Sequence, residues 1–153
     1  MTVTVIRGGR LTDPLGSDRP ATDTGADVAM DDQSGLITAV GSGLDGDRVL
    51  DASQCTVAPG LVDVNAHLGQ PGFESAETIE TASRAAALGG FTAVVARPDT
   101  APRPDTAAMV SSVRALAKSA LCQVYPAGAL TVDRAGNTLA PHGELADAGV
   151  RVF

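Results

Sequence analysis

The feature that most constrains the fold of this chain is a regular alternation of expected strands and helices that begins near residue 56. Apolar runs bounded by turn residues predict the strands, and apolar positions at helical spacing predict the helices between them. Strands and helices that alternate in this way form parallel βαβ units, so the sequence predicts an α/β fold. The expected strands cover residues 55–67, 91–98, 122–130 and 150–153, and the expected helices cover residues 75–90, 105–120 and 142–149.

The two longer helices carry signals at their ends. The helix over 75–90 has Glu77 and Glu80 in its first turns, where negative charge suits the helix dipole, and Gly89-Gly90 at its end. The second helix has Asp105 as its expected N-cap. Its apolar positions share one face of a 3.6-residue period and are Met109, Val113, Leu116, Ala117 and Ala120.

Residues 1–57 follow a different pattern. Short β-branched runs at 2–6, 26–30, 35–40 and 48–53 alternate with turn-rich spacers such as GSGLDGD. This pattern is typical of short antiparallel strands. We therefore expect two domains, a small β-rich module over 1–57 and an α/β portion over 58–153.

Charge and apolar content exclude some classes of partner. Eighteen acidic and eleven basic residues give a net charge of −7, which disfavours nucleic acid and anionic lipid. The first residues do not show the pattern of a secretory signal, and no apolar run in the sequence reaches the length of a membrane span. Cys55 and Cys122 form neither a Cys-x-x-Cys pair nor a disulfide framework, so we expect reduced, buried thiols and a cytoplasmic location.

Polar residues accumulate where the expected strands end. The carboxyl ends of parallel strands meet at one edge of a sheet, which places residues 63–72, 97–105 and 128–138 on a common rim. In the first of these strands Asp63, Asn65 and His67 alternate, so their side chains are expected on one face. Asp133 and Arg134 are expected in a solvated turn.

The run VAPGLVDVNAHLGQPGFESAETIETASRAAALGGFTAVVARPDTAPRPDT resembles the amidohydrolase superfamily, and within it dihydroorotases and their allantoinase and hydantoinase relatives. The resemblance extends back through VIRGGRL and on to the end of the chain. It implies a partial (β/α)8 TIM barrel, comprising the first three to four βα units, preceded by a small β-sandwich module. A complete barrel takes about 250 residues. We therefore expect the chain to be the N-terminal part of a longer protein, or a truncated product that must pair with something.

The resemblance implies zinc-assisted hydrolysis of a cyclic amide. In this family a His-x-His pair at the end of the first barrel strand binds zinc. Here the pair reads Asn65-Ala66-His67, and an amide oxygen is a poor substitute for imidazole nitrogen. Besides His67 the chain contains only His142, expected as a surface or capping residue at the start of a short helix. We expect zinc to be absent or weakly bound, with His67 either a metal ligand or a hydrogen-bonded rim residue.

The positions that bind substrate in dihydroorotases are also altered. Gly69 stands where the family has an Arg that grips a carboxylate, and Asp99 stands where it has an Asn. Arg97 and Arg103 lie nearby, outside the family pattern. Asp99 is expected as a turn or cap residue, or as a substrate-binding residue. No catalytic residue is assigned in this segment.

These features predict a dihydroorotase-like cyclic amidohydrolase homologue of the pyrimidine-biosynthesis type whose activity is impaired. One alternative is a non-catalytic structural partner of aspartate transcarbamoylase, since some dihydroorotase-like proteins lack metal ligands and act in that way. Another is a metal-dependent hydrolase repurposed for a different cyclic amide. Self-association is the remaining possible partnership.

Overall fold

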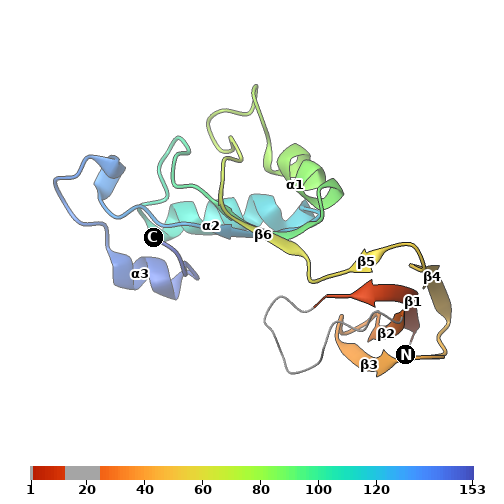
Figure 1. Cartoon of the computed structure of the whole chain (residues 1–153). Coiled ribbons are helices and arrows are strands. Elements are labelled where there is room, and N and C mark those ends of the chain that lie inside the picture. Colours follow the sequence, from red (N-terminus) through yellow and green to blue (C-terminus); the bar gives the residue numbers. More distant parts are fainter. Residues whose placement is uncertain (1, 13–24) are drawn as a thin grey trace. The chain divides into compact units, whose positions relative to one another are not determined.

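The computed structural model describes residues 2–12 and 25–153 of the chain. Two compact units are distinguished by their internal contacts: unit 1 within Met1–Pro59 and unit 2 over Gly60–Phe153. Unit 1 is built from strands, and unit 2 from strands alternating with helices (Figure 1). The chain is therefore a mixed α/β protein, as its sequence predicts. In the described residues no helix combines the length and the apolar character needed to cross a membrane.

Unit 1 contains a mixed sheet with the strand order β3-β2-β1-β4, in which β5 also pairs with β1. The β1–β2 and β2–β3 pairs are antiparallel, whereas β4 and β5 run parallel to β1. The expectation of purely antiparallel strands is therefore wrong. Residues 42–47 connect β3, at one edge of the sheet, to β4, which lies next to β1 at the other end of the strand order. This crossover lets β4 run parallel to β1. The strands are β1 Val3–Leu11, β2 Ala26–Asp31, β3 Ile37–Gly41, β4 Arg48–Asp51 and β5 Thr56–Val57.

Unit 2 contains a parallel sheet with the order β6-β7-β8. Helix α1 connects β6 to β7, and α2 followed by η1 connects β7 to β8, so the alternation predicted from the sequence is present (Figure 1). The elements are β6 Leu61–Ala66, α1 Ile79–Leu88, β7 Phe91–Ala96, α2 Ala107–Leu116, η1 Ala117–Ser119, β8 Gln123–Pro126, η2 Val132–Arg134 and α3 His142–Asp147.

Helix α1 begins later than predicted because residues 74–76 form a turn and the helix is capped by Thr78. The Thr78 hydroxyl accepts from the backbone N–H of Thr81 at 3.2 Å, and the Thr81 hydroxyl accepts from the backbone N–H of Thr78 at 3.1 Å. This reciprocal arrangement satisfies backbone donors that a helix start leaves unpaired. Ile79 at the first turn is 1% exposed and packs in a core with Leu68, Val94, Ala96 and Val113.

Helix α2 is capped by Thr106, whose hydroxyl accepts from the N–H of Met109 at 3.3 Å, and not by Asp105 as predicted. The Asp105 carboxylate instead accepts from the backbone N–H of Asp133 at 2.8 Å. The helix ends at Leu116, which is 37% exposed, because the chain tightens into the 3₁₀ turn η1. Its buried positions are Val110 and Val113, so the periodic pattern located the inner face but missed Val110.

The expected fourth strand over 150–153 is not formed. Val152 nevertheless accepts a backbone bond from Gly128 at 2.9 Å, which holds this segment beside the end of β8. Val150 is buried with Val110, Ala140 and Leu145 in a second apolar cluster. A second backbone bond, from Val150 to the carbonyl of Leu145 at 3.0 Å, and this cluster hold the C-terminal segment without a strand ladder.

Candidate functional site

The candidate site lies at the carboxyl ends of β6 and β7. His67 directly follows β6, Arg97 directly follows β7, and Asp99 lies two residues further on. The backbone N–H of Arg97 donates to the carbonyl of Ala66 at 2.9 Å, which extends the pairing of the two strands to the site. The parallel sheet therefore brings together residues that are 32 positions apart in the sequence.

The side chains of His67, Arg97 and Asp99 form one cluster, called the rim cluster below. Nδ1 of His67 lies 3.0 Å from Oδ2 of Asp99, and a guanidinium nitrogen of Arg97 lies 2.9 Å from the same oxygen. The Asp99 side chain is 14% exposed, whereas those of His67 and Arg97 are 47% and 42% exposed. The largely buried carboxylate of Asp99 thus pairs with two side chains that are themselves exposed to solvent.

The side chain of Asp99 therefore does not cap a turn. Its backbone carbonyl, not its carboxylate, accepts from the guanidinium of Arg103, which also donates to the carbonyl of Thr100 at 2.7 Å. Arg103 closes the turn after β7, and Arg97 balances the charge of the carboxylate. The sequence placed both arginines near Asp99 but could not assign these different roles.

Asp63 and Asn65 do not extend the cluster. The Asp63 carboxylate accepts from the backbone N–H of Asn65 at 2.8 Å, and the β6–β7 register shifts between Asp63 and Ala66. The shift interrupts the strict alternation expected for Asp63, Asn65 and His67. Asn65 is exposed, and Val62 and Val64 on the same strand are also 56% and 71% exposed.

Gly69 occupies a position that accepts no larger residue without movement. Its φ is +67°, and an added Cβ would lie 2.6 Å from the carbonyl oxygen of Glu77. Gly72 is similarly close to the carbonyl oxygen of Ala101, at 2.5 Å. An arginine at position 69 would meet backbone and would also adopt a strained left-handed conformation. The loop after β6 therefore packs closely against the backbone of Glu77 at this glycine.

The loop that carries Gly69 is also tied to α1. The side-chain oxygen of Gln70 accepts from the backbone N–H of Ile79 at 3.1 Å, which pairs one of the free amides at the helix start. Gln70 was not singled out from the sequence, because its role depends on a contact nine residues away. The residues after β6 therefore form a fixed support for His67.

These residues do not fit the zinc centre that the family implies. Over residues 2–12 and 25–153 no three His, Cys, Asp or Glu side chains are grouped so that they could hold a metal ion. His67 is the only imidazole of the rim cluster, and the Asp99 oxygen that faces it is shared with a permanent cation. A zinc site needs about four nitrogen, sulfur or carboxylate ligands, three of them from protein. The rim presents a charge-paired cluster instead.

The remaining residues singled out from the sequence lie elsewhere. His142 is half-buried and its Nε2 donates to the carbonyl of Leu130 at 2.8 Å, so it joins α3 to the segment after β8 and caps no helix. Asp133 and Arg134 are exposed in η2, and both adopt positive φ. Cys55 is exposed, contrary to the expectation of burial, and Cys122 is half-buried.

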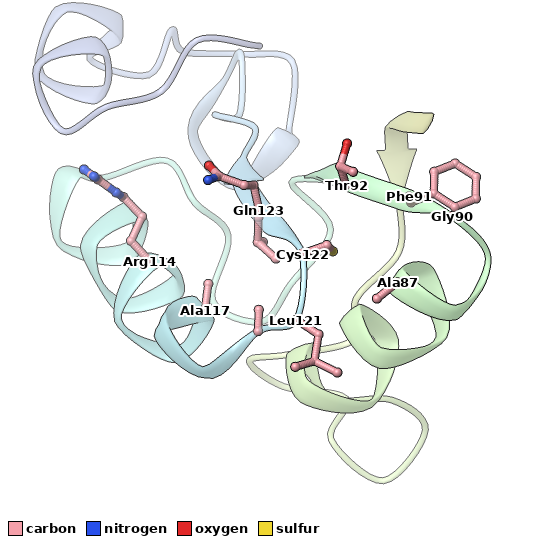
Figure 2. Close-up of a pocket in the computed structure, with 11 residues that line it drawn as sticks. Ala87, Gly90, Phe91, Thr92, Arg114, Ala117, Leu121, Cys122 and Gln123 are labelled. Carbon is pink, nitrogen blue, oxygen red and sulfur yellow. The ribbon is translucent and has the colours of Figure 1, made fainter. Parts of the chain in front are cut away.

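An open hollow of about 650 Å³ lies at the amino ends of β7 and β8, opposite the rim of the same sheet. Figure 2 shows Ala87, Ala117, Cys122 and Gln123 among the residues that line it. Burial raises the pKa of the Cys122 thiol, so less of the reactive thiolate forms. Arg114 at the edge donates to the carbonyl of Ala148 at 2.7 Å. The candidate site is therefore placed at the rim, where the side chains of His67, Arg97 and Asp99 meet.

A parallel sheet with alternating helices and polar groups after its first strands defines the class as an α/β protein with its site at the strand ends. The family is shown by sequence. The profile of the family described as "Dihydro-orotase-like" matches residues 55–153, and the chain belongs to this family of amidohydrolases. It is 45% identical over 148 residues to a dihydroorotase from Solibacter usitatus, covering 95% of this chain and 33% of that protein. The chain thus spans about a third of the length of the curated relatives it matches.

Solved structures agree with the fold. An L-hydantoinase (dihydropyrimidinase) from Arthrobacter aurescens superposes with a TM-score of 0.76 at 24% identity, covering 98% of this chain and 32% of the other. Atrazine chlorohydrolase from Arthrobacter aurescens TC1, solved in complex with zinc, superposes with a TM-score of 0.58 at 16% identity, covering 94% and 41%. At these identities the likeness concerns the fold alone.

Proposed function

We propose that the chain forms the first part of a dihydroorotase-like cyclic amidohydrolase of pyrimidine biosynthesis, with unit 1 as part of its β-sandwich module and unit 2 as the first units of its (β/α)8 barrel. Support comes from the 45% identity to a dihydroorotase and from the superposition of nearly the whole chain on a hydantoinase. We further propose that this portion does not supply the zinc pair. The observation that carries this second part is the rim cluster, in which His67 contacts Asp99 and the partner position holds exposed Asn65.

The experiment is metal analysis of the purified chain together with an assay of dihydroorotate ring opening. We expect less than one tenth of a zinc ion per chain and no metal-dependent turnover. The Asn65→His variant is the matched comparison, because it restores one imidazole without entering the closed loop at Gly69. One zinc ion per wild-type chain with turnover of dihydroorotate would contradict the impairment. Metal-dependent opening of another cyclic amide would instead support a repurposed enzyme.

A second candidate function is that of a non-catalytic structural partner, and the exposure of β6 favours it. Leu61, Val62 and Val64 are 54%, 56% and 71% exposed on a strand that pairs only with β7 in the described residues. An apolar edge strand of this kind is completed by further chain or by a partner. We propose aspartate transcarbamoylase or a second copy of the chain as that partner.

Sedimentation of the chain alone and mixed with an aspartate transcarbamoylase separates these partners. A concentration-dependent dimer supports self-association, and a co-sedimenting complex supports the transferase. The Val64→Thr variant, which keeps the shape of the side chain, is expected to weaken either association. A monomer that stays monomeric with the transferase would exclude both.

A further inference from the structure

Two side chains with opposite effects on metal binding contact the same oxygen of the rim cluster, Oδ2 of Asp99. Nδ1 of His67 lies 3.0 Å from it, and the Arg97 guanidinium lies 2.9 Å from it. The imidazole partner would help a metal ion to bind here, and the guanidinium partner would hinder it. Which influence prevails decides what this rim can hold.

The His67–Asp99 contact taken alone resembles the support of a metal-binding histidine. A carboxylate that accepts from Nδ1–H fixes the tautomer in which Nε2 carries the lone pair, and ligating histidines commonly have such a partner. No protein hydrogen bond to Nε2 of His67 occurs in the described residues, and the side chain is 47% exposed. The asparagine at position 65 therefore leaves one oriented and accessible imidazole nitrogen on the rim, that of His67.

Arg97 supplies the opposing influence. Its positively charged guanidinium pairs with Oδ2 of Asp99, the carboxylate that would otherwise offset the charge of a cation. A second guanidinium, that of Arg103, is held by the carbonyls of Asp99 and Thr100 in the turn after β7. A divalent ion near His67 would thus approach fixed positive charge without a free carboxylate to compensate.

We propose that Arg97 is the residue that keeps a divalent cation from the rim, so that restoring the second imidazole at position 65 is insufficient to restore a metal site. The proposal rests on the proposed function, in which this rim corresponds to the zinc-binding end of an amidohydrolase sheet. It adds that the charge of the rim changed as well as its ligand set. Asp99 is a positioning residue for His67, and Arg97 determines whether the pair is available to a metal.

The test measures zinc affinity, with zinc alone as the probe, by competition with a chromophoric chelator. The variants are wild type, Asn65→His, and Asn65→His combined with Arg97→Gln. We expect the double variant to bind zinc at least about tenfold more tightly than Asn65→His, since one adjacent positive charge is removed and one carboxylate is released. Equal affinity of the two, including equally undetectable binding, overturns the proposal.

Two controls separate this effect from general charge. Asn65→His with Arg97→Lys keeps the charge and is expected to bind as weakly as Asn65→His. Asn65→His with Arg84→Gln removes the same net charge on α1, where Arg84 pairs with Glu80 at 3.9 Å, and is expected to gain less than twofold. A gain from Arg84→Gln as large as that from Arg97→Gln would also overturn the proposal.

Folding and the proposed function are checked separately. Arg97 is 42% exposed, and Arg97→Met gives a second neutral variant that keeps the apolar stem. Far-ultraviolet circular dichroism verifies that each variant is folded, and a neutral variant that is folded must show the gain. Stoichiometric zinc in the wild type would refute the metal-free rim of the proposed function. A zinc-free wild type with no gain from Arg97→Gln or Arg97→Met would refute only the role of Arg97.

Discussion

The two units differ in how they hold their carboxylates. In unit 1, Asp27 is 4% exposed, and its two oxygens accept from the backbone N–H groups of Gly8 at 2.9 Å and Leu44 at 3.0 Å. In unit 2, Asp99 is held by the side chains of His67 and Arg97. Backbone donors are fixed by the fold, whereas side-chain donors can be changed by single substitutions. The comparison indicates that Asp27 maintains the sheet and that Asp99 belongs to an adaptable site.

The support of the rim, in contrast to the cluster itself, is fixed. Gly69 and Gly72 bring the loop after β6 against backbone carbonyls, and Gln70 joins the same loop to α1. A close approach between backbones leaves no room for a side chain. The rim therefore combines exchangeable charged groups with a loop that resists substitution.

The largest expected effect concerns this loop. We expect Gly69→Ala to lower the free energy of unfolding of unit 2 by about 3 kcal/mol, from the positive φ and the clash with Glu77 together. Gly136→Ala is the control, because its φ of +79° is similar and its Cβ would meet no atom within 4 Å. It is expected to cost about 1 kcal/mol. Urea unfolding followed by the fluorescence of Tyr125, the single tyrosine, measures both, and equal losses would contradict a fixed loop.

The next effect tests the carboxylates directly. Asp27→Asn places an amide NH₂ against a backbone donor, so we expect it to destabilise unit 1 more than Asp99→Asn destabilises unit 2. Asp99→Asn keeps an acceptor for His67 and loses a partly exposed ion pair, which is worth below about 1 kcal/mol. Residue-resolved hydrogen exchange measures the stability of each unit. A larger loss for Asp99→Asn would reverse the comparison.

The smallest expected effect is a dependence on acid. Hydrogen bonds from the backbone of Gly8 and then of Leu44 lower the pKa of Asp27, and the Ser34 side chain and then the Gln33 backbone lower that of Asp31. Because the folded pKa values lie below the unfolded value of about 3.9, this stabilisation is present above about pH 4 and is lost as the pH falls through the folded values. Exchange of the Gly8 amide, corrected for its intrinsic rate, is expected to rise across that range. Unchanged protection down to pH 2 would contradict this.

The sequence alone determined the alternation of strands and helices in unit 2 and the family, whereas the departures at Asn65, Gly69 and Asp99 stay predictions from the resemblance. Hydrophobic periodicity and short motifs are local properties, so they can be recognised without coordinates. The same local rules placed the cap of α2 one residue early, because Asp105 and Thr106 are both good caps and only the fold assigns Asp105 to Asp133.

Only the tertiary structure decided the parallel pairing of β1 with β4, the shared oxygen of the rim cluster, and the closed loop at Gly69. Each depends on groups far apart in the sequence, or on backbone conformation, which residue identity does not specify. An aspartate at position 99 is visible in the sequence. Whether its carboxylate contacts His67, Arg97 or solvent is set by the packing of the two strand ends.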